Sequence, residues 1–153
     1  MELDPEVERK LAVDLFNYVW TYLDKSDRTS AENDTMLHAA HASRYHWGQI
    51  GTPVNLARGE WQVSRVYAVL GRSEPALYHA QRCLEICQEN NIADFDLAYA
   101  YEALARGSAG ALQWHAVKQY LELAEQSGQQ ITEQEDKDWF NKDLKTVPTP
   151  PSG

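Results

Sequence analysis

The chain has 153 residues, of which 43% are hydrophobic and 24% are charged, so it is long enough for one globular domain with a sizeable core. Its formal net charge of −9 at pH 7 argues against nonspecific binding to nucleic acid or to an anionic membrane, because both require a basic surface. No apolar run approaches the roughly 20 residues that span a bilayer, and the acidic start Met1–Asp4 is unlike a secretory signal. We therefore expect a cytoplasmic protein.

The N-terminal third of the chain carries the signals of two helices. Asp4 can cap the first helix, and Pro5 fits its first turn, where the missing N–H is not needed. An apolar stripe at helical spacing follows, made of Leu11, Leu15, Val19 and Tyr22. Thr29 and Glu32 have the spacing of a capping box that opens a second helix. We expect an N-terminal helical pair over residues 5–50.

Two further helices are indicated between residues 52 and 90. Thr52-Pro53 repeats the start signal of the first helix, and Gly71 separates the third helix from the fourth. Cys83 and Cys87 lie on the apolar side of the fourth helix. Two cysteines four residues apart on one helix are poorly placed for an unstrained disulfide, so we expect free thiols and a reducing compartment.

The C-terminal third is also helical in pattern. A fifth helix is expected from about Asp94 to Arg106, and a sixth from Ala109 to Gln126. Thr132–Glu135 has the spacing of another capping box, which would open a short last helix. The tail 146–153 has three prolines in eight residues, and we expect it to be disordered. No segment shows sustained period-two alternation, so a sheet is not expected.

The third and fourth expected helices can be laid over the fifth and sixth. The pairs Tyr67–Tyr101, Ala76–Gly110 and Cys83–Val117 are each 34 residues apart (101 − 67, 110 − 76 and 117 − 83), which is the period of tetratricopeptide repeats. Within Ala57–Gln88, Tyr67 takes the first-helix aromatic position, Gly71 the turn glycine and Ala76 the small residue near the start of the second helix. On these residues the chain resembles the tetratricopeptide repeat family.

This resemblance implies an all-α fold. We expect a right-handed stack of antiparallel helical hairpins, about seven helices in all, forming one domain over residues 1–145 with repeats at 52–90 and 91–127. The pattern departs from the family at Glu60, where an aromatic residue is usual, and at Ala105, which stands at the second turn glycine.

In the tetratricopeptide family the first helix of each pair lines a concave groove that binds other proteins. By this resemblance the groove would present two trios at helical spacing, namely Arg58, Trp61 and Arg65 from one repeat and Tyr99, Glu102 and Arg106 from the next. Arginine and aromatic side chains often act as binding hot spots. Alternatively, Arg58 and Arg65 pair inside the fold with carboxylates such as Glu60, Glu102 or Asp94.

The charge distribution suggests what such a groove would bind. From Met36 to Arg82 there are five arginines and two acids, a net of 5 − 2 = +3 within an acidic chain. The sequence therefore predicts a module that binds a protein or peptide, without a cofactor and without nucleic acid or membrane among its partners. The basic centre makes an acidic partner one option. The exposed ends of a short helical stack also favour a homo-oligomer.

A second hypothesis is a small-molecule- or metal-binding helical domain. Asp34, His38 and His41 stand at i, i+4 and i+7, on one face of the second helix, and neighbouring pairs among them could chelate an ion. The sequence supplies no convincing further ligand. It also has no nucleophile elbow or phosphate-binding loop, so no catalytic residue is assigned and an enzyme is not favoured.

Overall fold

The computed structural model describes residues 1–151, and across that range it contains seven α-helices and no strand. The helices are α1 (Pro5–Leu23), α2 (Ser30–Ile50), α3 (Pro53–Val69), α4 (Ser73–Glu89), α5 (Asp94–Gly110), α6 (Trp114–Gln129) and α7 (Gln134–Leu144). The predicted all-α class and helix number are therefore confirmed. Within the described part of the chain, none of the helices is long and apolar enough to cross a bilayer.

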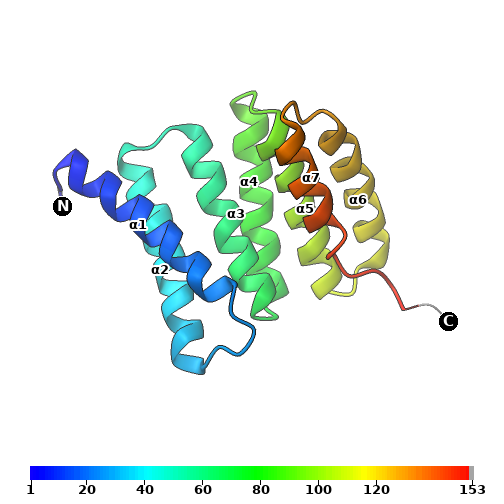
Figure 1. Ribbon diagram of the computed structural model, residues 1–153, viewed down its shortest axis with the longest axis horizontal. Coiled ribbons are helices and arrows are strands. Elements are labelled where there is room, and N and C mark those ends of the chain that lie inside the picture. Colours follow the sequence, from blue (N-terminus) through cyan, green and yellow to red (C-terminus); the bar gives the residue numbers. More distant parts are fainter. Residues whose placement is uncertain (152–153) are drawn as a thin grey trace.

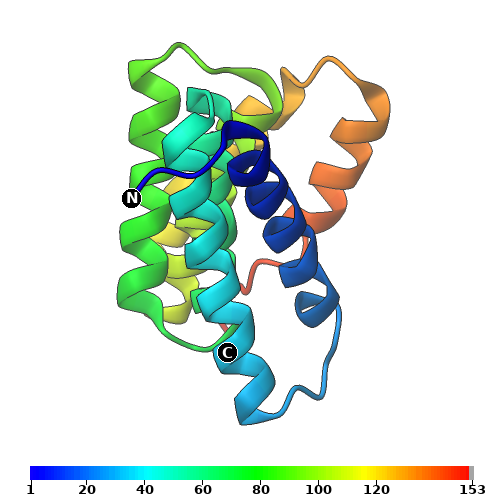
Figure 2. The same ribbon diagram turned by 90° about the vertical axis from the view of Figure 1, so that its left-hand side faces the viewer.

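Consecutive helices pair as antiparallel hairpins, and the hairpins stack side by side (Figure 1). Helices α1, α3, α5 and α7 contact one another in series and form a first layer, and α2, α4 and α6 form a second layer. Helices α1 and α7 lie on the same side of the molecule, toward the viewer in Figure 1 and on the right in Figure 2. The molecule is thus the expected stack of helical hairpins, with α7 added at its C-terminal end.

Side-chain hydrogen bonds fix the helix starts. Thr29 Oγ1 accepts a bond from the Glu32 N–H, and the Glu32 carboxylate accepts one from the Thr29 N–H, both at 3.1 Å, so the first capping box is confirmed. The capping box expected at Thr132–Glu135 is wrong. The N–H and the hydroxyl of Thr132 instead donate to Asp94 Oδ2, at 3.2 and 3.0 Å. These bonds tie the start of α7 to the start of α5.

The hairpins repeat with a longer period than the sequence pattern suggests. Helix α5 begins 41 residues after α3 (94 − 53), and α6 begins 41 residues after α4 (114 − 73). The predicted 34-residue register is therefore wrong. It places Gly71 opposite Ala105, whereas Ala105 lies in the interior of α5 and is buried.

The boundary between α5 and α6 explains this error. Helix α5 continues to Gly110, beyond the expected end at Arg106, although glycine disfavours helix, because Gly107, Ser108 and Ala109 are buried in its last turns and packing outweighs propensity. The turn contains Leu112 at φ 59°, where the first hairpin has Gly71 at φ 74°. A left-handed leucine gives no sequence signal, since glycine is the residue normally expected there.

Small residues allow the helices to approach closely where they cross. A Cβ atom added to Gly107 of α5 would lie 2.9 Å from Leu77 Cδ2 of α4. Ser64 Oγ of α3 donates to the Ala76 carbonyl of α4 at 2.7 Å, so a buried hydroxyl also joins the two helices of a hairpin. Both cysteines are free and buried, as expected from their spacing.

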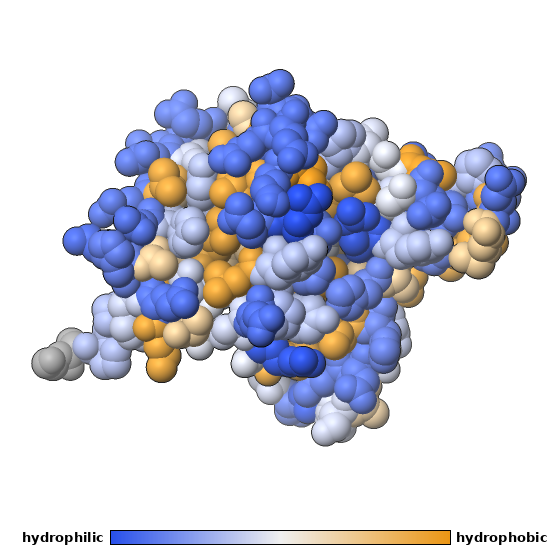
Figure 3. Space-filling model, turned by 180° about the vertical axis from the view of Figure 1, so that it is seen from behind, coloured by the Kyte–Doolittle hydropathy of each residue, from blue (hydrophilic) through white to orange (hydrophobic). Residues whose placement is uncertain are grey.

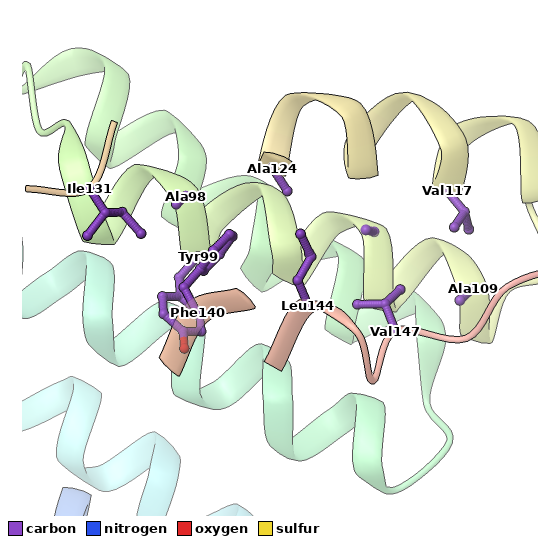
Figure 4. Packing of buried hydrophobic residues seen from close by; sticks show 10 residues of the cluster. Ala98, Tyr99, Ala109, Val117, Ala124, Ile131, Phe140, Leu144 and Val147 are labelled. Atoms are coloured by element: carbon purple, nitrogen blue, oxygen red, sulfur yellow. The ribbon is translucent and has the colours of Figure 1, made fainter. Parts of the chain in front are cut away.

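Helix α7 is anchored by a continuous hydrophobic cluster (Figure 4). Phe140 is fully buried next to Tyr99, and Leu144 and Val147 continue the cluster toward the C-terminus. Arg106 Nη2 donates to Thr146 Oγ1 at 2.8 Å. The expected disordered tail 146–153 is therefore wrong for its first two residues, because one is hydrogen-bonded and the other is buried; residues 152–153 lie outside the described range.

Candidate functional site

A pocket of about 440 Å³ opens on the first layer, and its lining side chains come mainly from α1, α3, α5 and α7. Six of them are aromatic: Phe16 and Trp20 of α1, Trp61 of α3, Phe95 and Tyr99 of α5, and Trp139 of α7. The remainder are Ala57, Arg58, Cys83, Asp96, Asp136 and Asp143. We call this site the aromatic pocket. Its volume lies in the range of about 300–1,000 Å³ found for ligand sites.

Contacts between rings hold the walls of the aromatic pocket in place. Trp20 of α1 stacks on Trp61 of α3, with ring centroids 5.9 Å apart. Tyr99 of α5 meets Trp61 edge-on at 5.5 Å and meets the buried Phe140 of α7 at 4.9 Å. The pocket lining therefore continues directly into the core that anchors α7, and these contacts hold Trp20, Trp61 and Tyr99 in place without a ligand.

A buried carboxylate lies next to these rings. Glu102 has no solvent exposure, and its Oε1 accepts a hydrogen bond from Trp61 Nε1 at 3.0 Å. Its Oε2 accepts from Arg106 Nε at 2.6 Å and from Arg65 Nη1 at 3.3 Å. Trp61 and the two arginines thus satisfy both oxygens. Burial lowers the pKa of Arg65, although the Glu102 charge opposes that shift.

Asp143 connects this network to α7. The Tyr99 hydroxyl donates to Asp143 Oδ2 at 2.7 Å, and Arg106 Nη2 donates to the Asp143 carbonyl at 3.2 Å. Burial, followed by the hydrogen bond to Asp143, raises the pKa of Tyr99 well above its usual value. Tyr99 therefore stays protonated and acts as a donor at physiological pH. Both arginines form ion pairs with Glu102, whereas the Asp143 carboxylate forms none with a described side chain.

The rim of the aromatic pocket is more exposed. Arg58 Nε and Nη2 donate to the two oxygens of Asp96 at 2.8 and 3.2 Å, and this bond to Asp96 raises the pKa of Arg58. On α7, Trp139 is 60% exposed. Asp136 has no hydrogen-bond or ion-pair partner among residues 1–151, although its charge acts on Arg58.

The structure brings the six predicted binding residues together, but in two different environments. Three of them, Arg58, Trp61 and Tyr99, line the aromatic pocket. The other three, Arg65, Glu102 and Arg106, form the polar network next to it. All three arginines have a carboxylate partner. The internal pairing considered from the sequence is therefore present, with Asp96 rather than Asp94 as the partner of Arg58.

The pocket walls contributed by α1 and α7 were not among the residues predicted from the sequence. Phe16 and Trp20 are one helical turn apart, as are Trp139 and Asp143. That spacing gives each pair a common helix face and was a usable signal. What the sequence lacks is any indication that these two faces, which are over 100 residues apart, meet across α3 and α5.

The second hypothesis concerned Asp34, His38 and His41. In the structure, His41 Nε2 hydrogen-bonds the Tyr67 hydroxyl at 2.8 Å, and its ring lies 5.5 Å from that of His79. Over the described residues, no group of three or more histidine, cysteine, aspartate or glutamate side chains is placed to hold a metal ion. These three residues therefore do not form a ready metal centre.

A polar cluster lies beside this histidine helix. His79 Nδ1 and Glu60 Oε2 are 2.6 Å apart, and Arg44 Nε lies 3.3 Å from Glu60 Oε1. Burial raises the pKa of Glu60, but the bond to His79 and the charges of His79 and Arg44 outweigh it and lower the pKa overall. Glu60 is a buried anion held between α2 and α4, which accounts for its departure from the aromatic pattern.

The second layer forms the opposite face of the molecule. Seen from behind, it is dominated by hydrophilic residues with hydrophobic ones exposed between them (Figure 3). Tyr78 of α4, in the second layer, is 61% exposed, nearly the same fraction as Trp139.

Comparison of the chain with models of known protein families finds no match. Comparisons with curated proteins and with solved structures also find none.

Proposed function

We propose that this chain is a binding module that takes up a segment of a partner protein in the aromatic pocket. The observation that carries the proposal is the convergence of six aromatic side chains from four helices on one opening. Exposed aromatic side chains are costly to leave in water and are frequent anchors of protein interfaces. The contacts that hold Trp20, Trp61 and Tyr99 also favour binding, because these side chains lose little freedom when a ligand enters.

The pairing of the arginines changes the kind of partner that we propose. An acidic segment was expected because of the basic centre of the sequence. Arg65 and Arg106 already share Glu102, and Arg58 is paired with Asp96. An acidic group would have to compete with these carboxylates, so the proposal does not extend to an acidic partner.

We also propose that the chain is a diverged relative of tetratricopeptide repeat proteins that works in the cytoplasm. The stack of helical hairpins and the small residues at the helix crossings support the first point, while the 41-residue period (94 − 53) stands against a regular repeat. The two buried free thiols are compatible with a reducing compartment.

The experiment that tests the proposed function is selection of peptides from a random displayed library, followed by affinity measurement on two variants. Trp139→Ala removes an exposed ring at the pocket rim, and Tyr78→Ala removes an equally exposed ring from the opposite layer. We expect Trp139→Ala to weaken the selected peptides about tenfold or more, as a hot-spot residue does. Tyr78→Ala should change affinity less than about twofold. Equal effects of the two variants, or no selected peptide at all, would contradict the proposal.

A further inference from the structure

We propose that the aromatic pocket accepts a positively charged side chain, arginine or lysine, from the partner segment. This inference rests on the proposed function and names the chemistry of the ligand. It follows from the charges left at the pocket after internal pairing and from the nature of its rings.

The first step is the charge balance around the pocket. Four of the lining residues are charged, namely Arg58, Asp96, Asp136 and Asp143. Arg58 pairs with Asp96, and the Asp143 carboxylate accepts a hydrogen bond from the Tyr99 hydroxyl. Neither Asp136 nor Asp143 forms an ion pair with a described side chain. The lining therefore carries more negative than positive charge, and a cation from a ligand can balance it.

The second step concerns the rings. The negative face of an aromatic ring attracts cations, and tryptophan does so most strongly. Three of the lining residues are tryptophans. The chain already places cations over two of them: the Arg65 guanidinium lies 5.8 Å from the Trp61 ring, and the Lys142 ammonium lies 5.4 Å from the Trp139 ring. Trp61 is already covered by Trp20 and Arg65, whereas the Trp139 ring is 60% exposed and can still take a ligand cation.

The third step is the relative position of the carboxylate and the ring. Asp136 and Trp139 are three residues apart on α7, so their side chains project from one face of that helix, and both line the pocket. A side chain that enters beside α7 would place its apolar stem against the rings and its charged end near Asp136. Arginine and lysine have that form, with an apolar stem and a charged end.

The test uses nine-residue peptide pools that are identical except for a fixed central residue, which is Arg, Lys, Leu or Glu. Affinity is measured for wild type, for Asp136→Asn and for the control Glu135→Gln, which removes the same charge from the neighbouring exposed position outside the pocket. We expect the Arg and Lys pools to bind about tenfold more tightly than the Leu and Glu pools. Asp136→Asn should reduce that preference to about threefold or less, whereas Glu135→Gln should leave it unchanged.

The outcomes separate this inference from the proposed function. The inference is overturned, and the proposed function left standing, if peptides lose affinity for Trp139→Ala but show no preference for a basic central residue. The same holds if they show such a preference and Asp136→Asn does not change it. Peptide binding that does not depend on Trp139 would overturn the proposed function itself. Acetylarginine amide, tested alone, should bind at least tenfold more weakly than the Arg pool. Equal binding would contradict a protein segment as the source of the cation.

Discussion

Replacing Glu102 with glutamine gives the sharpest prediction about how the pocket is supported. Glutamine has nearly the same shape as glutamate, so the change removes a charge without opening a cavity. Glu102 accepts three hydrogen bonds, from Trp61, Arg65 and Arg106, at 3.0, 3.3 and 2.6 Å. A glutamine side chain has only one oxygen, and its NH2 group cannot accept, so at least one of these donors would face another donor.

The magnitude follows from the burial of the three charged groups. The side chains of Glu102, Arg65 and Arg106 are only 1%, 19% and 14% exposed. Removing one partner from a buried ion pair leaves an uncompensated buried charge and costs about 3–5 kcal/mol. We expect Glu102→Gln to lose that amount of unfolding free energy, which is a large fraction of the roughly 5–15 kcal/mol that holds a domain together.

Asp96→Asn provides the matched control for Glu102→Gln. It makes the same chemical change at the rim, where the Arg58 side chain is 52% exposed and the Asp96 side chain 13% exposed. Because Arg58 can keep its charge in water when Asp96 is replaced, this variant should lose about 1 kcal/mol or less. Urea unfolding followed by circular dichroism measures both, with the slope m checked for a common denatured state. A loss below about 1 kcal/mol for Glu102→Gln, equal to that of Asp96→Asn, would refute the reasoning.

Three further predictions concern stability. Gly128→Ala should cost about 1–3 kcal/mol in thermal unfolding, because the new Cβ would lie 2.6 Å from Cε2 of the buried Phe140. Gly71→Ala should cost about 1–2 kcal/mol in urea unfolding for a different reason: its φ of 74° strains any residue with a Cβ, although the surrounding space is open. Stability should also fall on acidification through pH 6.5. Burial and, to a smaller extent, the charge of His79 lower the pKa of His41 below its usual value of 6.5. Just below that pH, His41 therefore binds more protons in the unfolded chain than in the folded one, so a lower pH favours unfolding. Glutamine in His41→Gln can still hydrogen-bond Tyr67. Between pH 7.5 and 5.5 the urea midpoint of this variant should fall less than that of wild type.

Each of these has an outcome that contradicts it. An unchanged midpoint in Gly128→Ala would mean that Phe140 can move aside, so that α7 is not fixed by it. Gly71→Asn should be milder than Gly71→Ala, since asparagine tolerates the left-handed conformation, and the reverse order would contradict backbone strain as the cause. If His41→Gln shows the same pH dependence as wild type, the acid sensitivity does not come from His41.

The general architecture could be predicted from the sequence because its signals are local. The apolar stripe of α1, the capping box at Thr29 and the glycine turn at Gly71 each act within a few residues. The repeat register could not be predicted in the same way. Leu112 adopts the left-handed conformation without being glycine, so no glycine marks the turn after α5, and the family pattern placed that turn at Ala105, seven residues too early (112 − 105).

The candidate site was predictable only in part. Spacing alone placed Trp61 and Arg65 on one helix face, and Glu102 and Arg106 on another. Whether an arginine on such a face binds a ligand or an internal acid depends on which side chain lies opposite, and that is a long-range property of the fold. The wall formed by Trp139 depends on α7 docking through Phe140, which likewise has no local sequence signal.

The most direct test of the central claim is a charge exchange between Asp136 and the centre of the ligand. Isothermal titration would compare wild type with Asp136→Lys, each against one selected peptide with a central arginine and its counterpart with a central glutamate. If a cationic side chain is held in the aromatic pocket near Asp136, Asp136→Lys should bind the arginine peptide about tenfold or more less tightly than wild type does. The same variant should bind the glutamate peptide more tightly. Unchanged affinity of the arginine peptide for Asp136→Lys would contradict it.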